Sequence, residues 1–106
     1  MSNRREAIAK RRAKAREAGD ATPAEQRLVD AWLERSWAEH GLARSTLDNY
    51  RRDLTALAVW LGGAGSSLVA ASPDHLNRWL AGRSRDGYSA RSNARALSSV
   101  RRFYAD

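Results

Sequence analysis

The chain has 106 residues, the usual length of one domain, and its 29% charged and 42% hydrophobic residues are typical of a soluble globular protein. No apolar run approaches the roughly 20 residues of a membrane span, and the first 20 residues lack the apolar core of a secretory signal, so we expect a cytoplasmic protein without membrane association. The absence of cysteine excludes disulfides, thiolate metal sites and cysteine nucleophiles. Nineteen basic against twelve acidic residues give a net charge of +7, and all the basic residues except Lys10 and Lys14 are arginine. This bias favours a polyanionic partner such as nucleic acid, because guanidinium pairs bidentately with phosphate and with guanine edges.

Residues 1–19 form a basic N-terminal segment with seven basic and two acidic side chains. Its large apolar side chains are Met1 and Ile8, too few to bury a face and offset the entropy of ordering the chain. We therefore expect a largely disordered tail with some helical bias. Residues 20–106 hold twelve basic and ten acidic side chains, and the sequence predicts a single folded domain there.

The first predicted helix spans about Pro23 to His40. Thr22 to Glu25 carry the capping-box pattern with proline at the first helical position, and Gly41 supplies a left-handed residue at the end. One apolar stripe is predicted to face the core, and it consists of Leu28, Val29, Trp32, Leu33 and Trp37.

A second helix is predicted from Ser45 to Leu61, with Ser45 and Asp48 repeating the capping pattern. Its inward stripe has spacings of three and four residues and consists of Leu47, Tyr50, Leu54, Leu57 and Leu61. The loop at 62–67 is rich in glycine and serine, and we expect Leu68 and Val69 to attach it to the core.

Two more helices are predicted in the remaining sequence. Ser72 and Pro73 open a short third helix that ends before a polar segment at 82–87. Ser89 can cap a fourth helix that runs into the C-terminus, with an inner face of Ala94, Leu97, Val100 and Tyr104. No alternating strand pattern is present, so the fold class is all-α, with four helices.

The four tryptophans could pack in the core or serve as stacking platforms for bases. Trp32 and Trp79 fall on core stripes, which favours packing. Trp37 and Trp60 lie toward the stripe edges, so both interpretations stay open for them.

The second and fourth helices carry the most specific sequence signal. They read S-T-L-D-N-Y-R-R-D-L-T-A-L-A-V-W-L at 45–61 and Y-S-A-R-S-N-A-R-A-L-S-S-V-R-R-F-Y at 88–104. Together they resemble the N-terminal core-binding domain of tyrosine recombinases of the Xer and phage-integrase kind, over about Leu28 to Tyr104. The resemblance implies a four-helix SAM-like domain at residues 20–106.

In that family this module and a larger catalytic domain close around duplex DNA, and the resemblance places only the first of the two here. His75 to Arg78 matches the His-x-x-Arg letters of a catalytic motif, but it directly follows Ser72 and Pro73, which makes His75 a residue of the first turn of a helix. Tyr104 continues a core stripe without an activating cluster nearby and is expected to pack. The sequence thus predicts no catalytic residue, no metal ion and no cofactor in this chain.

Helical spacing predicts two DNA-contacting edges, on the exposed faces of the second and fourth helices. Ser45, Asn49 and Arg52 share one face near the start of the second helix, where free backbone amides favour phosphate. Arg91, Arg95 and Arg102 share a face of the fourth helix with Ser92 and Ser99 alongside. The full predicted set is Arg44, Ser45, Thr46, Asn49, Arg52, Ser89, Arg91, Ser92, Arg95, Ser99 and Arg102. A solvated charged face is the alternative for both edges.

We expect the DNA-binding core-binding domain of a site-specific tyrosine recombinase or integrase, gripping one side of the duplex at the recombination site. The alternative is a stand-alone helical adaptor that binds protein, with a basic tail that binds polyanions non-specifically. The predicted partners are double-stranded DNA and, in a full-length parent, other recombinase protomers that assemble as a tetramer on two duplexes. The isolated domain is expected to be monomeric. The fourth helix reaches Asp106 without a glycine stop, which favours a chain cut from a longer one.

Overall fold

The computed structural model describes residues 4–6, 8–10 and 20–105. Four helices form the domain, which are α2 (Pro23–His40), α3 (Arg44–Gly63), α4 (Pro73–Arg85) and α5 (Ala90–Ala105). No strand occurs in the described part of the chain, so the predicted all-α fold is confirmed. Residues 4–6 and 8–10 of the predicted tail are helical, and the rest of residues 1–19 lies outside the described residues.

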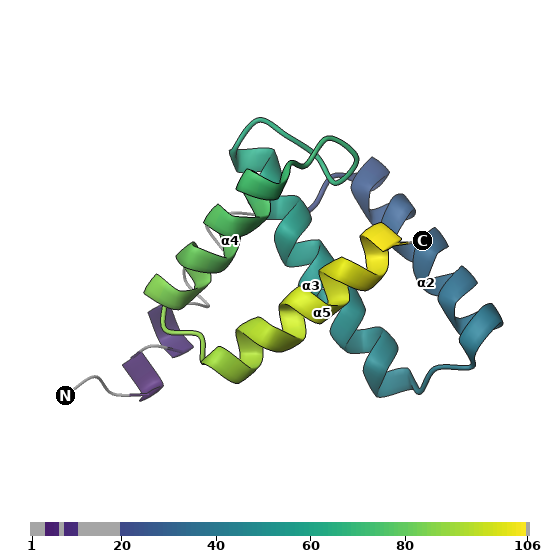
Figure 1. Ribbon diagram of the computed structural model, residues 1–106, viewed down its shortest axis with the longest axis horizontal. Helices are drawn as coiled ribbons and strands as arrows, with labels where there is room; N and C mark the ends of the chain where they lie inside the picture. Colours follow the sequence, from purple (N-terminus) through teal and green to yellow (C-terminus); the bar gives the residue numbers. More distant parts are fainter. Residues whose placement is uncertain (1–3, 7, 11–19, 106) are drawn as a thin grey trace.

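Helix α3 is the centre of the domain. It packs against α2, α4 and α5, and α4 also packs against α5. In Figure 1, α5 crosses in front of α3, while α2 and α4 lie on opposite sides of this crossing. Each helix thereby buries one face and leaves the other open to solvent.

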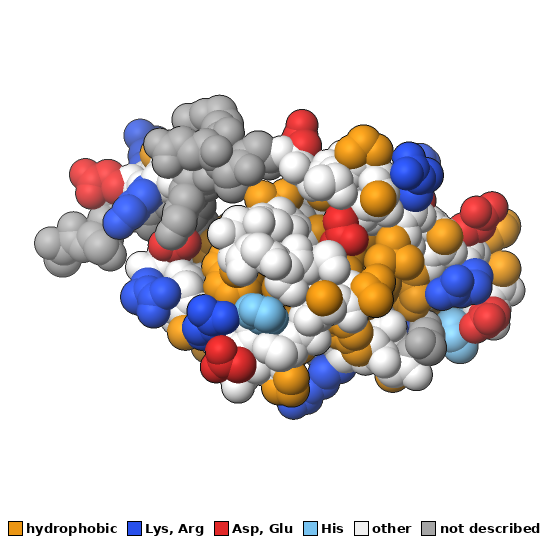
Figure 2. Space-filling model, turned by 90° about the horizontal axis from the view of Figure 1, so that it is seen from above, with side chains coloured by type: hydrophobic (Ala, Val, Ile, Leu, Met, Phe, Trp, Pro, Cys, Tyr) orange, Lys and Arg blue, Asp and Glu red, His pale blue; other side chains and the backbone are white. Residues whose placement is uncertain are grey.

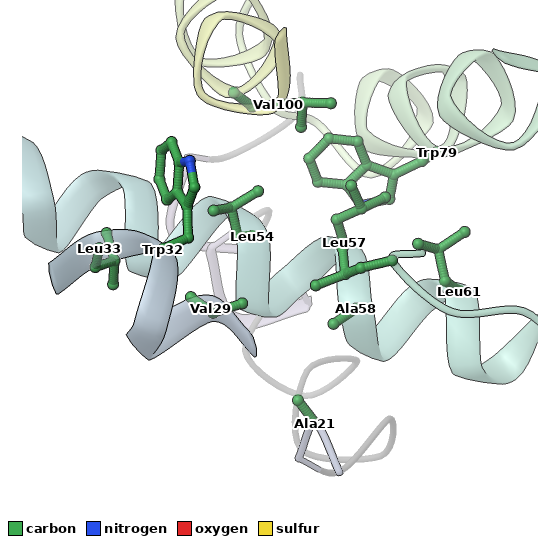
Figure 3. Packing of buried hydrophobic residues seen from close by; sticks show 12 residues of the cluster. Ala21, Val29, Trp32, Leu33, Leu54, Leu57, Ala58, Leu61, Trp79 and Val100 are labelled. Carbon is green, nitrogen blue, oxygen red and sulfur yellow. The ribbon is translucent and has the colours of Figure 1, made fainter. Parts of the chain in front are cut away.

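The core is built around the middle and C-terminal half of α3. Trp32 is 1% exposed, and its ring centroid lies 5.5 Å from that of Tyr50 and 5.3 Å from that of Phe103. Trp79 is 4% exposed and comes in from α4, and Figure 3 shows its ring next to Leu57 of α3. The core placement predicted for both tryptophans is confirmed. The buried hydrophobic residues are Ala21, Val29, Trp32, Leu33, Leu54, Leu57, Ala58, Leu61, Leu68, Trp79, Ala96 and Val100.

Local capping signals set several helix ends where the sequence predicts them. The Thr22 hydroxyl accepts a hydrogen bond from the Glu25 amide at the start of α2. At the start of α4, Ser72 and His75 form a capping box in which each side chain accepts from the other residue's backbone N–H. Gly41 ends α2 with φ of 59°, a left-handed conformation that glycine adopts without steric cost.

One predicted cap is wrong, and one predicted capping box is only half formed. Helix α3 begins at Arg44, and its N-cap is Ala43, which makes no side-chain capping bond. Ser45 therefore lies inside the first turn rather than before it. At α2, the Glu25 carboxylate does not complete a capping box, because it accepts a hydrogen bond of 2.9 Å from the distant Leu68 amide.

Helix α4 is longer than the sequence predicts, continuing through Gly82 to Arg85. The reason is Arg83, which is 7% exposed. Its guanidinium donates to the side chains of Asn93 (2.9 Å) and Ser92 (3.1 Å), and its Cζ atom lies 3.9 Å from the centroid of the Tyr88 ring. These contacts with the start of α5 stabilise a turn that contains a poor helix former.

The inner face of α5 also differs from the prediction. Ala94 is exposed and Tyr104 is 40% exposed, whereas Ala96, Ser99 and Val100 are buried and Phe103 packs against the core. The predicted inward position of Val100 is confirmed and Leu97 is half-buried, whereas the other buried positions of α5 differ from the predicted ones. Small residues caused the error, because Ala96 and Ser99 give little hydrophobic signal.

Two further side chains are more exposed than predicted. Trp37 is 60% exposed, because the face of α2 that meets α3 continues from Leu33 to the small, buried Ser36. Val69 is 83% exposed, while its neighbour Leu68 is fully buried and attaches the loop to the core as expected. Within the described residues, no helix is long and apolar enough to cross a membrane.

Candidate nucleic-acid interface

The first edge of the candidate interface lies at the start of α3. Arg44, Ser45 and Arg52 are exposed, and Thr46 and Asn49 are half-buried. The Arg52 guanidinium donates to the Asn49 side-chain oxygen at 2.5 Å, which joins two predicted contacts one turn apart. Both side chains offer polar groups on the outer face of the helix. The backbone N–H groups of this first turn add partial positive charge.

The second edge is the outer face of α5. Arg91 and Arg95 are exposed, and Arg102 is half-buried. The exposed Ser98 stands between them at the position that continues the same stripe, so the face reads Arg91, Arg95, Ser98 and Arg102 at i, i+4, i+7 and i+11. Ser98 was missed by the sequence prediction, although the same spacing rule would have found it.

The start of α5 is held by two predicted contact residues, Ser89 and Ser92, and by Arg83. The Ser89 hydroxyl accepts a hydrogen bond from the Ser92 amide at 3.1 Å and so caps the helix as predicted. The Ser92 hydroxyl accepts from Arg83, which fixes its orientation. Arg91 lies in the same first turn and is exposed. The first turn of α5 is thus attached to α4 through Arg83, while its outer side, with Arg91, is exposed to solvent.

The predicted exposure of Ser99 is wrong. Ser99 is 1% exposed, and its hydroxyl donates a hydrogen bond of 2.9 Å to the carboxylate of Asp53, which is 2% exposed. The shift in the phase of α5 turns this side chain toward α3. Ser99 is therefore a packing residue between the helices and is left out of the interface.

Asp53 joins the two edges. Besides accepting from Ser99, its carboxylate lies 3.8 Å from the Arg95 guanidinium. Asn49 stands one turn before Asp53 on α3, so the outer edge of α3 and the arginine stripe of α5 meet at the crossing of these helices. Figure 1 shows this crossing near the middle of the domain.

Charge is unevenly distributed over the described surface. Between Ala90 and Ala105 the sequence of α5 contains four arginines and no acidic residue. On α3, Arg51 is paired with Asp30 of α2, and Asp48 adds a negative charge. In the view of Figure 2 the middle of the face is mostly polar and hydrophobic, and the Lys and Arg side chains lie toward its edges together with acidic ones. The α5 stripe is thus the more uniformly basic of the two edges.

The letters that resemble a catalytic motif have structural roles here. His75 belongs to the α4 capping box, and Arg78 forms an ion pair of 3.1 Å with Asp74. The Tyr104 hydroxyl donates a hydrogen bond of 2.6 Å to the Leu68 carbonyl. Burial, together with the nearby Glu25 carboxylate, raises the pKa of Tyr104 to about 12, which opposes the loss of its proton. No cluster of acidic or histidine side chains that could hold a metal ion occurs in the described part of the chain.

Comparison with known proteins decides the family. Residues 29–105 match the family model of the phage integrase N-terminal SAM-like domain, which covers α3, α4, α5 and most of α2. The chain belongs to this family. The predicted resemblance is therefore confirmed. No solved structure gives a significant match to this SAM-like domain.

Curated relatives agree with the family assignment. The chain is 48% identical over 82 residues to a protein named tyrosine recombinase XerD from Xanthomonas axonopodis pv. citri. This alignment covers 77% of the chain and 27% of that protein. The chain is 44% identical over 97 residues to tyrosine recombinase XerD of Xanthomonas campestris pv. campestris, and this alignment covers 92% of the chain and 30% of that relative. Tyrosine recombinase XerD of Yersinia pestis is 46% identical over 77 residues. The chain thus spans less than a third of the length of these relatives.

Proposed function

We propose that this chain is the DNA-binding core-binding domain of a site-specific tyrosine recombinase and grips one side of the duplex at the recombination site. The proposed contacts are Arg44, Ser45, Thr46, Asn49 and Arg52 on α3, and Ser89, Arg91, Ser92, Arg95, Ser98 and Arg102 at or on α5. Strand cleavage would belong to a catalytic domain in a longer parent protein. Its partners would be double-stranded DNA and other recombinase protomers, in a tetramer on two duplexes, and its location would be cytoplasmic.

The arginine stripe of α5 carries the proposal. A helical face with exposed arginines at i and i+4, a half-buried arginine at i+11 and no acid on the same helix is suited to a major groove. There the N-terminal part meets base edges and the rest meets phosphate. Arg83 holds the start of this helix against α4, and so reduces the freedom that would otherwise be lost on binding.

The α3 edge supports the same docking surface. Its Arg52–Asn49 pair offers polar groups beside the helix crossing, and its first turn begins without a side-chain cap on Ala43. Oxygen atoms of a phosphate are suitable acceptors for the N–H groups at such a helix start. Two helices that meet at Asp53 would thus contact the duplex together.

The deciding experiment compares the full chain with a chain that begins at residue 20. Both are titrated against a duplex enriched from a random pool and against a scrambled duplex at several salt concentrations. We expect the shorter chain to keep its preference for the enriched duplex. Because residues 1–19 hold seven basic side chains, we expect the salt slope of log affinity to flatten by several units, at roughly 0.9 per neutralised phosphate.

Failure of the shorter chain to bind duplex DNA would contradict the proposal. Binding would then belong to residues 1–19 alone, as in the adaptor that the sequence left open. Binding of both duplexes with equal affinity would leave only a non-specific contact and would contradict recognition of a site.

A further inference from the structure

A buried carboxylate lies directly behind the proposed DNA-contacting face. Asp53 is 2% exposed, while the side chain of Arg95 is 44% exposed. A carboxylate that is removed from water needs compensation from charge or hydrogen bonds. Ser99 provides a hydrogen bond, and Arg95 provides the nearby positive charge.

In the Asp53–Arg95 pair, the carboxylate is buried and the guanidinium is partly exposed. At 3.8 Å, the contact between the Arg95 Nη2 atom and the Asp53 carboxylate is an ion pair rather than a hydrogen bond. The attraction is stronger than for two exposed charges, because one partner is excluded from solvent. Arg95 is thereby drawn toward α3, while its side chain stays 44% exposed and so remains accessible to DNA.

The Ser99 hydroxyl fixes the carboxylate itself. Its hydrogen bond of 2.9 Å to Asp53 comes from the same helix as Arg95, one turn further along. The carboxylate therefore stays at one place in the helix crossing, and its pull on Arg95 has a fixed direction. An arginine that is oriented before binding loses less freedom when it pairs with a base.

We propose that Asp53 is a positioning residue that orients Arg95 for sequence recognition and restrains its use as a general phosphate anchor. This inference rests on the proposed DNA-binding function. It gives a role to a buried acid that lies behind a surface whose charged side chains are otherwise mainly basic. The carboxylate lowers the local positive potential, so it costs non-specific affinity while it improves discrimination.

The test is a double-mutant cycle with Asp53→Asn and Arg95→Ala, titrated against an enriched duplex and a scrambled duplex at one salt concentration. Asparagine keeps the shape of the side chain and an acceptor for Ser99. We expect Asp53→Asn to strengthen binding to the scrambled duplex and to lower the ratio of specific to non-specific affinity about tenfold. In the Arg95→Ala background, Asp53→Asn should leave that ratio unchanged.

Ser99→Ala is the matched control, because it removes the hydrogen bond from the same carboxylate but keeps the charge beside Arg95. It should destabilise the domain and, because it loosens the carboxylate without removing its charge, lower the affinity ratio by less than Asp53→Asn does. If Ser99→Ala lowers the ratio as much as Asp53→Asn does, the effect comes from helix packing and the proposal is wrong. The proposal is equally wrong if Asp53→Asn acts the same with and without Arg95.

A measurement on the unmodified protein covers the case in which Asp53→Asn does not fold. Side-chain NMR of the Nε–H groups should show Arg95 more restrained than the exposed Arg91, one turn earlier on α5. Equal mobility of the two arginines would overturn the positioning role while leaving DNA binding intact. Absence of any preferred duplex for the unmodified chain would instead overturn the proposed function, and this inference with it.

Discussion

The Tyr104 hydroxyl donates a hydrogen bond of 2.6 Å to the backbone carbonyl of Leu68. The amide of the same Leu68 donates to the Glu25 carboxylate at 2.9 Å. One buried loop residue thus connects the first turn of α2 with the last turn of α5. Both hydrogen bonds join residues far apart in the sequence, so local sequence alone does not predict how the loop and the last turn of α5 are held.

Tyr104→Phe should lower the free energy of unfolding by about 1 kcal/mol at neutral pH, because the Leu68 carbonyl loses its side-chain donor. The difference between the two proteins should shrink at high pH. The pKa of Tyr104 is raised to about 12 in the fold against 10.0 in the unfolded chain, so its contribution is complete below pH 10 and is lost as the pH rises toward 12. Urea unfolding of both proteins between pH 7 and 11.5 checks this expectation. A constant difference over that range would contradict it.

Trp32→Ala and Trp37→Ala should have very different effects, although both positions belong to the predicted stripe of α2. Trp32 is 1% exposed and contacts two aromatic rings, so its truncation should cost about 3–5 kcal/mol of stability. Trp37 is 60% exposed, and its truncation should cost well under about 1 kcal/mol. Chemical denaturation followed by far-UV circular dichroism measures both. Similar losses for the two variants would show that Trp37 is buried in solution.

Arg83→Met should destabilise the domain by about 2–4 kcal/mol and loosen the end of α4. The substitution retains an unbranched apolar side chain but leaves Asn93 and Ser92 without the donors that the guanidinium supplies. Amide exchange should increase most from Gly82 to Arg85, where the helix depends on this anchor. Arg85→Met, at an exposed position two residues later, is the control and should change stability by less than about 0.5 kcal/mol. Equal effects of the two variants would exclude the anchoring role.

Arg91→Ala and Arg95→Ala should reduce the ratio of specific to non-specific DNA affinity, each by about tenfold, the discrimination that one good arginine–guanine pair provides. Arg102→Ala should weaken binding to both duplexes by about the same factor, because this side chain lies two to three turns further along α5, where phosphate is the expected partner. Titrations at one fixed salt concentration separate these outcomes. Equal losses for all three variants on both duplexes would make α5 a phosphate clamp without sequence preference.

The sequence by itself determines where most helices lie. Several helix ends are set by bonds between residues at most four positions apart, so the sequence alone is enough to predict them. These residues are Thr22 with Pro23, Ser72 with Pro73, Ser89 and Gly41. Trp32 and Trp79, in the middle of their apolar stripes, also mark the core, whereas the equally large Trp37 at the edge of its stripe does not. The exposed arginines of α5 follow from the same periodicity.

Tertiary structure decides what small and polar residues do. The spacing of α5 fits two phases. The observed one buries Ser99 and leaves Ala94 exposed, and it is the one in which Ser99 donates a hydrogen bond to Asp53, 46 residues away, and Phe103 packs against Trp32. The continuation of α4 through Gly82 depends on contacts of Arg83 with the next helix, and the Glu25 carboxylate turns from its own helix to Leu68. In each case a contact between distant segments outweighs a weak local preference, because burying a polar group requires a partner wherever in the chain that partner stands.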